Sequence, residues 1–222
     1  MNKAGDLKQY LDSIGKTNSA GEYLKLIKEW AEKKDYPALS VVLEELEKYS
    51  AAKPIVVAID GRSCAGKSTL AEMLSLVYQA SIVHMDDFFL PQNLRTPQRY
   101  AQAGGNVHYE RFIEEVLPHI RSGEAFKYRR FNCRIMDYGE EVLVNKANLM
   151  LVEGAYSLLP CFGEYYDLAI FMDIEPKEQL ARLKHRNPLL LRDFQEKWIP
   201  LEEKYFETLK IREKCQLILK SL

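Results

Sequence analysis

The chain has 222 residues, of which 47% are hydrophobic and 28% charged, and its formal net charge is −1. This length suits one α/β domain with an appendage, and the near-zero charge gives no overall attraction to nucleic acid or to an anionic membrane. We expect a cytoplasmic protein, because the four cysteines have neither metal-site nor C-x-x-C spacing. The sequence also shows no apolar stretch long enough for a membrane span and no signal-peptide core.

Residues 1–52 predict a small helical extension. Apolar side chains fall at helical spacing in three successive stretches: Leu7, Tyr10, Leu11 and Ile14; Tyr23, Leu24, Ile27 and Trp30; and Leu39, Val42, Leu43 and Leu46. Ser19 is placed to cap the second helix, and Pro37 to open the third. We expect this extension to pack on the main domain, with a homodimer contact or a regulatory role as the alternative.

From residue 53 to 222, predicted strands and helices alternate. The strands are expected at 55–59, 81–85, 149–153, 168–173 and 216–219, and the helices at 67–78, 109–121, 177–185 and 193–212. Short apolar strands separated by helices favour an α/β fold with three layers and a mostly parallel sheet, which binds ligands at the carboxyl ends of its strands. Between the second and third strands, residues 90–148 are long enough for a substrate-binding insert, with a hairpin or loop at 126–144.

The glycine-rich segment after the first strand is the strongest functional motif. It reads Gly61, Arg62, Ser63, Cys64, Ala65, Gly66, Lys67, Ser68, followed by Thr69. This pattern between a strand and a helix predicts a phosphate-binding loop whose backbone N–H groups point at an anion. Lys67 would reach the outer phosphates and Ser68 would bind Mg²⁺. The alternative, a glycine turn before an ordinary helix, is less consistent with these flanks.

Acidic residues end two of the other strands. Asp86 and Asp87 follow the second strand, where a carboxylate can accept a proton from an attacking hydroxyl or hold Mg²⁺. A turn or a helix cap is the structural alternative for this pair. Glu153 ends the third strand, and a nearby Mg²⁺ would remove the cost of burying its charge. Asp173 ends the fourth strand but is expected to cap the helix that follows.

Arginines and aromatic residues supply the remaining candidates. Arg182 and Arg186 share one face of a predicted helix. Their guanidinium groups can stabilise the negative charge of a phosphoryl group during its transfer, or they can simply form a solvated surface. In the insert, arginines alternate with rings, which suits a small polar substrate with a ring or equally a plain surface. The candidate substrate-binding residues are Asp86, Phe88, His108, Arg134 and Tyr138.

These motifs together resemble uridine kinase and its relatives, which include nicotinamide riboside kinases, bacterial pantothenate kinase and phosphoribulokinase. The resemblance covers roughly residues 54–220, and the acid followed by two phenylalanines at 86–89 is its most specific part. It implies ATP as the donor and Mg²⁺ as the metal. It also implies that Asp86 is the general base, that Ser68 and Glu153 lie at the Mg²⁺, and that Arg182 and Arg186 belong to a lid over ATP.

Two positions depart from that family. His108 stands where uridine kinases place an aspartate that grips the ribose hydroxyls, and Phe131-Asn132 stands where they carry a Tyr-Asp pair. We therefore expect a kinase of a small hydroxylated metabolite, with a nucleoside such as uridine or cytidine as the favoured acceptor. The alternatives are nicotinamide riboside, pantothenate or a sugar phosphate as acceptor, or a non-catalytic ATP-binding regulatory module.

Overall fold

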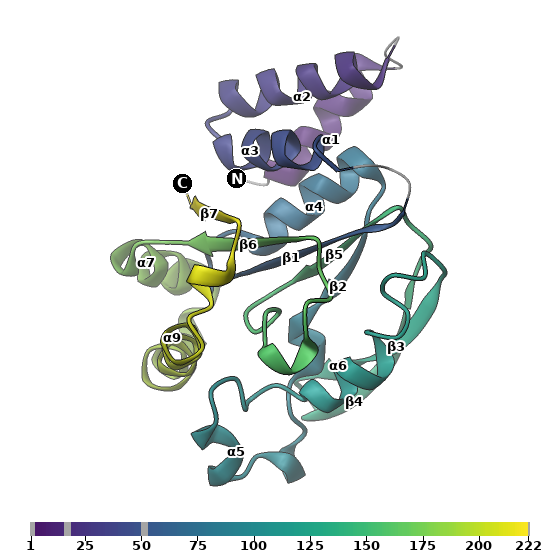
Figure 1. Ribbon diagram of the computed structural model, residues 1–222. Helices are drawn as coiled ribbons and strands as arrows, with labels where there is room; N and C mark the ends of the chain where they lie inside the picture. Colours follow the sequence, from purple (N-terminus) through teal and green to yellow (C-terminus); the bar gives the residue numbers. More distant parts are fainter. Residues whose placement is uncertain (1–2, 16–18, 50–52, 222) are drawn as a thin grey trace.

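A parallel sheet of five strands forms the centre of the molecule (Figure 1). The computed structural model describes residues 3–15, 19–49 and 53–221. Along the sheet the strands follow the order β2 (Ser81–His84), β5 (Leu149–Glu153), β1 (Ile55–Gly61), β6 (Leu168–Asp173) and β7 (Leu217–Lys220). All neighbouring strands pair in parallel, which confirms the predicted α/β sheet.

The sheet has a buried core on each face, because successive side chains of a strand point to opposite sides. In β1, Val57 and Ile59 belong to one core while Val56 and Ala58 belong to the other, and all four are completely buried. The first core is covered by α4 (Lys67–Tyr78). On the second face, α6 (Tyr109–Glu115) and α9 (Ile199–Thr208) contribute buried side chains. These helices make the outer layers of the fold.

The N-terminal helices form a further layer beyond α4. They are α1 (Lys3–Ile14), α2 (Ala20–Lys33) and α3 (Pro37–Leu46). In Figure 1 they lie on the side of α4 that faces away from the sheet. Their buried residues Leu7, Ile27 and Leu39 join the same core as the strand residue Val57. The extension therefore packs on the rest of the protein, while its predicted boundary at residue 52 lies outside the described residues.

The insert covers the opposite face near the β2 edge. The 3₁₀ helix η1 (Met85–Phe88) leads into the insert. The insert itself contains a second 3₁₀ helix, two short α-helices and an antiparallel hairpin: η2 (Gln92–Leu94), α5 (Pro97–Ala101), α6, β3 (Phe126–Asn132) and β4 (Asp137–Val144). The hairpin was one of the two predicted alternatives for 126–144. The predicted helix 109–121 instead ends at Glu115, because Pro118 lacks an N–H group and disfavours helical backbone before it.

The last quarter of the chain also differs from its prediction. The helix expected at 193–212 is broken into α8 (Leu191–Asp193), a π-helical turn η5 (Phe194–Trp198), α9 and a 3₁₀ turn η6 (Arg212–Lys214). Pro200 cannot donate the hydrogen bond that would continue a regular helix across this point. Upstream lie the 3₁₀ turns η3 (Pro160–Phe162) and η4 (Pro188–Leu190) and the helix α7 (Pro176–Arg186).

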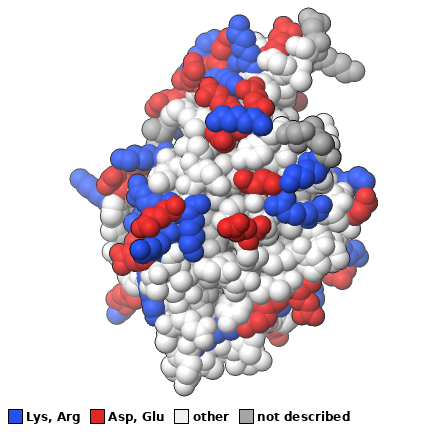
Figure 2. All heavy atoms as spheres, viewed as in Figure 1, with Lys and Arg blue, Asp and Glu red and all other residues white. Residues whose placement is uncertain are grey.

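The face of the molecule shown in Figure 2 carries acidic and basic side chains next to one another, most densely over the N-terminal helices. This interleaving agrees with a net charge near zero. Among the described helices, none has the length and apolar character that crossing a bilayer requires.

Candidate active site

The loop between β1 and α4 is built on two glycines with left-handed backbone. Gly61 has φ +130° and Gly66 has φ +99°. A Cβ on Gly61 would lie 2.1 Å from the carbonyl oxygen of Met172 in β6, so only glycine fits against that strand. Cys64 also has positive φ, at 61°. The loop therefore bends tightly and brings its backbone to the N-terminus of α4, where N–H groups and the helix dipole favour an anion.

Lys67 folds over this loop. Its ammonium donates hydrogen bonds to the carbonyl oxygens of Gly61, at 2.7 Å, and of Arg62, at 2.8 Å. The side chain is buried, and within the described ranges no carboxylate forms an ion pair with it. A buried ammonium that meets only neutral acceptors leaves a positive charge for an anionic ligand. The loop therefore fits the outer phosphates of a nucleotide.

Ser68 and Glu153 meet beside Lys67. The Ser68 hydroxyl donates to Glu153 Oε2 at 3.1 Å, and Glu153 Oε1 lies 2.6 Å from His84 Nδ1. The hydrogen bond to Glu153 and the negative charge of Glu153 raise the pKa of His84, whereas burial acts in the opposite direction. Across the described chain, no three His, Cys, Asp or Glu side chains converge as a metal cage. One hydroxyl and one carboxylate fit Mg²⁺, which commonly takes its other ligands from phosphates and water.

Asp86 occupies the first turn of η1, directly after β2. Its side chain keeps a solvent-exposed face, and none of the described residues donates a hydrogen bond to its carboxylate. Protein atoms nevertheless crowd around it, and this burial, together with the negative charge of Glu153, raises the pKa of Asp86. The charge of Lys67 acts in the other direction. The second-strand acid therefore lies within electrostatic reach of both Lys67 and Glu153.

Asp87 has a structural part instead. It is buried and accepts hydrogen bonds from the Tyr128 hydroxyl at 2.7 Å and from Arg130 Nε at 3.0 Å. Both donors come from β3, so Asp87 links the β3–β4 hairpin to η1, which also carries Asp86. At the hairpin turn, the negative charge of Asp86 is among the causes that raise the pKa of Cys133, after burial. The hairpin turn thus lies near Asp86.

The other candidate substrate residues lie in three different environments. His108 Nδ1 and the Tyr138 hydroxyl are 2.6 Å apart, and their rings stack at 5.9 Å between centroids. Burial lowers the pKa of His108, which keeps its ring neutral. Phe88, in contrast, is completely buried among Phe112 and Tyr128, so its ring serves the core and does not line an accessible site. Arg134 is exposed at the hairpin turn.

The two arginines of α7 also separate. Arg182 donates hydrogen bonds to the carbonyl oxygen of Cys64 at 3.1 Å and to Ser221 Oγ at 2.5 Å, and it pairs with Glu178. It therefore lies against the phosphate loop. Arg186 is the last residue of the helix and is exposed. Of these two arginines, Arg182 is the one that contacts the phosphate loop, and the lid role of both stays a prediction.

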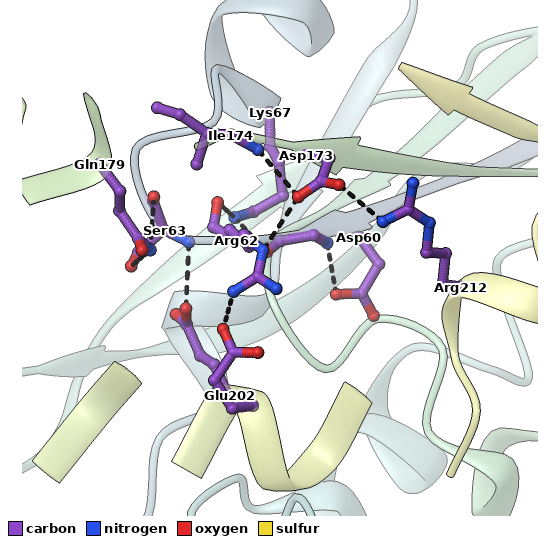
Figure 3. A network of polar contacts seen from close by, with 11 residues as sticks. Asp60, Arg62, Ser63, Lys67, Asp173, Ile174, Gln179, Glu202 and Arg212 are labelled. Carbon is purple, nitrogen blue, oxygen red and sulfur yellow. Dashed lines mark hydrogen bonds and ion pairs between the residues drawn. The ribbon is translucent and has the colours of Figure 1, made fainter. Parts of the chain in front are cut away.

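A network that the motifs did not indicate holds the loop through side chains of β6, α7 and α9 (Figure 3). The buried carboxylate of Glu202 accepts a hydrogen bond from the Ser63 N–H at 3.1 Å. Gln179 donates to the carbonyl and hydroxyl oxygens of Ser63, at 3.1 and 3.0 Å. Asp173 accepts hydrogen bonds from Arg62 Nε at 2.9 Å and from the Ile174 N–H at 3.0 Å, so it fixes the loop. It does not cap the following helix as expected, because the N-cap position of α7 is Glu175.

Asp60 is a further residue that the motifs did not indicate. Its fully buried carboxylate accepts hydrogen bonds from the N–H of Gly61 at 2.7 Å, from the Leu158 N–H at 3.0 Å and from the Tyr205 hydroxyl at 2.7 Å. Burial raises the pKa of Asp60, against the effect of these bonds. The sequence did offer a signal for Asp60, because it is an acid directly before the first glycine of the loop. Its position near the end of β1 is comparable to that of Glu153 at the end of β5.

Comparisons with known proteins agree with this architecture. No protein-family model matches the chain. A pantothenate kinase of Lactococcus lactis subsp. lactis is 24% identical over 149 residues, which cover 60% of this chain and 49% of that protein. The nicotinamide riboside kinase of Schizosaccharomyces pombe is 47% identical over 38 residues, or 17% of this chain and 16% of that protein. A possible uridine kinase from Bacillus stearothermophilus superposes with a TM-score of 0.65 at 16% identity, covering 85% of this chain and 99% of the other.

The chain spans about half the length of the pantothenate kinases that it matches. The structural likeness to the possible uridine kinase, at its low identity, concerns the fold. These findings confirm the α/β fold of P-loop kinases and are consistent with the predicted resemblance to the uridine kinase-like group.

Proposed function

We propose that this chain transfers the γ-phosphoryl group of ATP to a hydroxyl group of a small metabolite, with Mg²⁺ as the metal. The observation that carries the proposal is the position of Asp86. Its carboxylate is free of hydrogen-bond donors from the described residues, and it lies within electrostatic reach of Lys67 and Glu153 at the carboxyl end of the sheet. A phosphate-binding loop alone requires no such acid.

Each residue then has a defined task. Lys67 and the loop N–H groups hold the outer phosphates and offset the charge that develops on them. Mg²⁺ on the side of Ser68 and Glu153 would supply further neutralisation of the phosphate oxygens. Asp86 orients the acceptor hydroxyl and takes up its proton. Arg182 holds α7 against the loop and would contribute to a lid.

The acceptor that we favour is a nucleoside such as uridine or cytidine. The fold shared with a possible uridine kinase supports it, and the neutral His108–Tyr138 pair can bond to a diol. A neutral imidazole binds a diol more weakly than a carboxylate would. Pantothenate is therefore the second candidate, since several relatives with that printed activity match about 60% of the chain.

The test incubates the protein with ATP and Mg²⁺ and, in separate reactions, uridine, cytidine, pantothenate, nicotinamide riboside or a sugar phosphate, and identifies the product by mass spectrometry. Asp86→Asn should retain ATP binding and lose turnover by about 100-fold or more. Asp12→Asn, at an exposed position of α1, is the matched control and should keep full activity. Full activity of Asp86→Asn would refute the base assignment. ATP binding without transfer to any acceptor would favour a regulatory module.

A further inference from the structure

A pocket of about 320 Å³ adjoins the phosphate loop on the side opposite Asp86. Ala65, Gly66 and Thr69 of the loop and of α4 form one part of its wall, and Arg182 forms another. Met172 of β6 also lines it. The remaining wall comes from both ends of the described chain: Lys3, Tyr36 and Ala38 from the N-terminal segment, and Lys220 and Ser221 at the end of β7. Its volume is at the lower end of the range for small-molecule sites.

The order of the strands fixes what this pocket can hold. Asp86 follows β2 at one edge of the sheet, the phosphate loop follows central β1, and the pocket lies towards β6 and β7 at the other edge. An acceptor hydroxyl beside Asp86 must attack the terminal phosphate in line with the bond that breaks. The rest of the donor therefore extends away from Asp86, which is the direction of the pocket.

The chemistry of the wall points the same way. Lys3, Arg182 and Lys220 are three cations, whereas no carboxylate lines the pocket. Burial and then the charge of Arg182 lower the pKa of Lys3, against an opposing effect of Asp35. Ala38, Ala65 and Met172 add apolar surface. Cations next to an apolar wall suit a ligand that has a flat apolar part joined to a phosphate.

Tyr36 provides an independent observation. Its side chain is 6% exposed, and its hydroxyl has no hydrogen-bond partner among the described residues. The hydroxyl would lie 3.9 Å from a Cβ on Gly66, so it is directed at the phosphate loop. Burial raises the pKa of Tyr36 to about 12, so the group is a neutral donor at physiological pH. An unpaired buried hydroxyl is costly unless a ligand satisfies it.

We propose that the N-terminal extension contributes to the donor site, and that the Tyr36 hydroxyl donates a hydrogen bond to the nucleoside part of the donor nucleotide in this pocket and so raises its affinity. The extension, which lies outside the residues that carry the family resemblance, thereby becomes part of the active site. This inference rests on the proposed kinase function, because it assumes that the loop holds a nucleoside triphosphate.

The test compares ATP with inorganic tripolyphosphate, each with Mg²⁺, by calorimetric titration of the full chain. Tripolyphosphate can fill the loop but has no base. Tyr36→Phe removes only the unpaired hydroxyl, so it should raise the Kd for ATP by about two- to tenfold and leave tripolyphosphate binding unchanged.

Tyr78→Phe is the matched control, since Tyr78 packs against the same core at the far end of α4 and does not line the pocket. It should change neither Kd. The thermal midpoint of Tyr36→Phe should not fall, because no hydrogen bond is lost.

Four outcomes would overturn the inference. An unchanged Kd for ATP in Tyr36→Phe would show that the Tyr36 hydroxyl does not contact the nucleotide and that the side chain serves only the core. An equal weakening of ATP and tripolyphosphate would make the pocket an anion site instead of a nucleoside site. If the wild-type chain binds tripolyphosphate but shows no preference for ATP, the pocket takes no nucleoside, although phosphoryl transfer in the acceptor assay would still support the kinase function. Failure of the wild-type chain to bind any nucleotide would refute both.

Discussion

Replacing Gly61 by alanine tests the close approach of the phosphate loop to β6. The added Cβ would lie 2.1 Å from the carbonyl oxygen and 2.6 Å from the nitrogen of Met172, both backbone atoms that cannot rotate away. The Arg62 N–H donates to this same carbonyl oxygen at 3.1 Å, so separating the strands would also break that bond. Gly66→Ala is the matched control, because its Cβ would meet nothing nearer than 3.8 Å although its φ is also positive.

The expected free energies follow from these contacts. A left-handed alanine costs about 1–3 kcal/mol at either position, and the clash at Gly61 adds about 1–3 kcal/mol more. We therefore expect losses of unfolding free energy of about 4 kcal/mol for Gly61→Ala and about 2 kcal/mol for Gly66→Ala. Urea unfolding of the ligand-free protein measures both, provided that the m-value is unchanged. Losses for the two variants that agree within about 0.5 kcal/mol would show that β6 does not constrain the loop.

Two further predictions concern the insert. Tyr128→Phe removes a buried hydrogen bond to Asp87 and should lower the free energy of unfolding by about 2 kcal/mol. This corresponds to a fall in the thermal midpoint of roughly 4–8 °C. An equal midpoint for Tyr128→Phe and the control Tyr78→Phe would contradict this prediction. Burial alone would raise the pKa of Glu115, but hydrogen bonds from Arg111 and a backbone N–H lower it overall from 4.5. The stability that this carboxylate contributes is thus present above pH 4.5 and lost as the pH falls through the lowered pKa. The difference in unfolding free energy between wild type and Glu115→Gln should shrink from pH 7 towards acid, and a constant difference would refute the assignment.

The sheet and the phosphate loop were predictable because their signals are local. Apolar strand runs such as 149–153 and 168–173 match β5 and β6 residue for residue. The glycines of the loop are required by backbone geometry that any sequence with this motif must adopt. The helix at 67–78 also begins and ends as expected, because the loop fixes its start.

The missed features depend on contacts between distant parts of the chain. Glu202 lies on an ordinary amphipathic helix, and only the fold brings it to Ser63, 139 residues away. Phe88 follows the two acids and was expected to line the substrate site, but the aromatic residues of α6 and β3 draw its ring into the core. Tyr36 carries no motif, and its place beside Gly66 follows from the packing of the extension on α4.

The pocket beside the phosphate loop also bears on how the protein is made. Its walls include Lys3 in α1 and Ser221 after β7, which are separated by nearly the whole described chain. During synthesis the N-terminal helices leave the ribosome long before β7 pairs with β6, so this pocket is among the last features to assemble. A nucleotide bound there would contact both α1 and the segment after β7, and would therefore stabilise the folded protein over intermediates in which β7 is not yet paired.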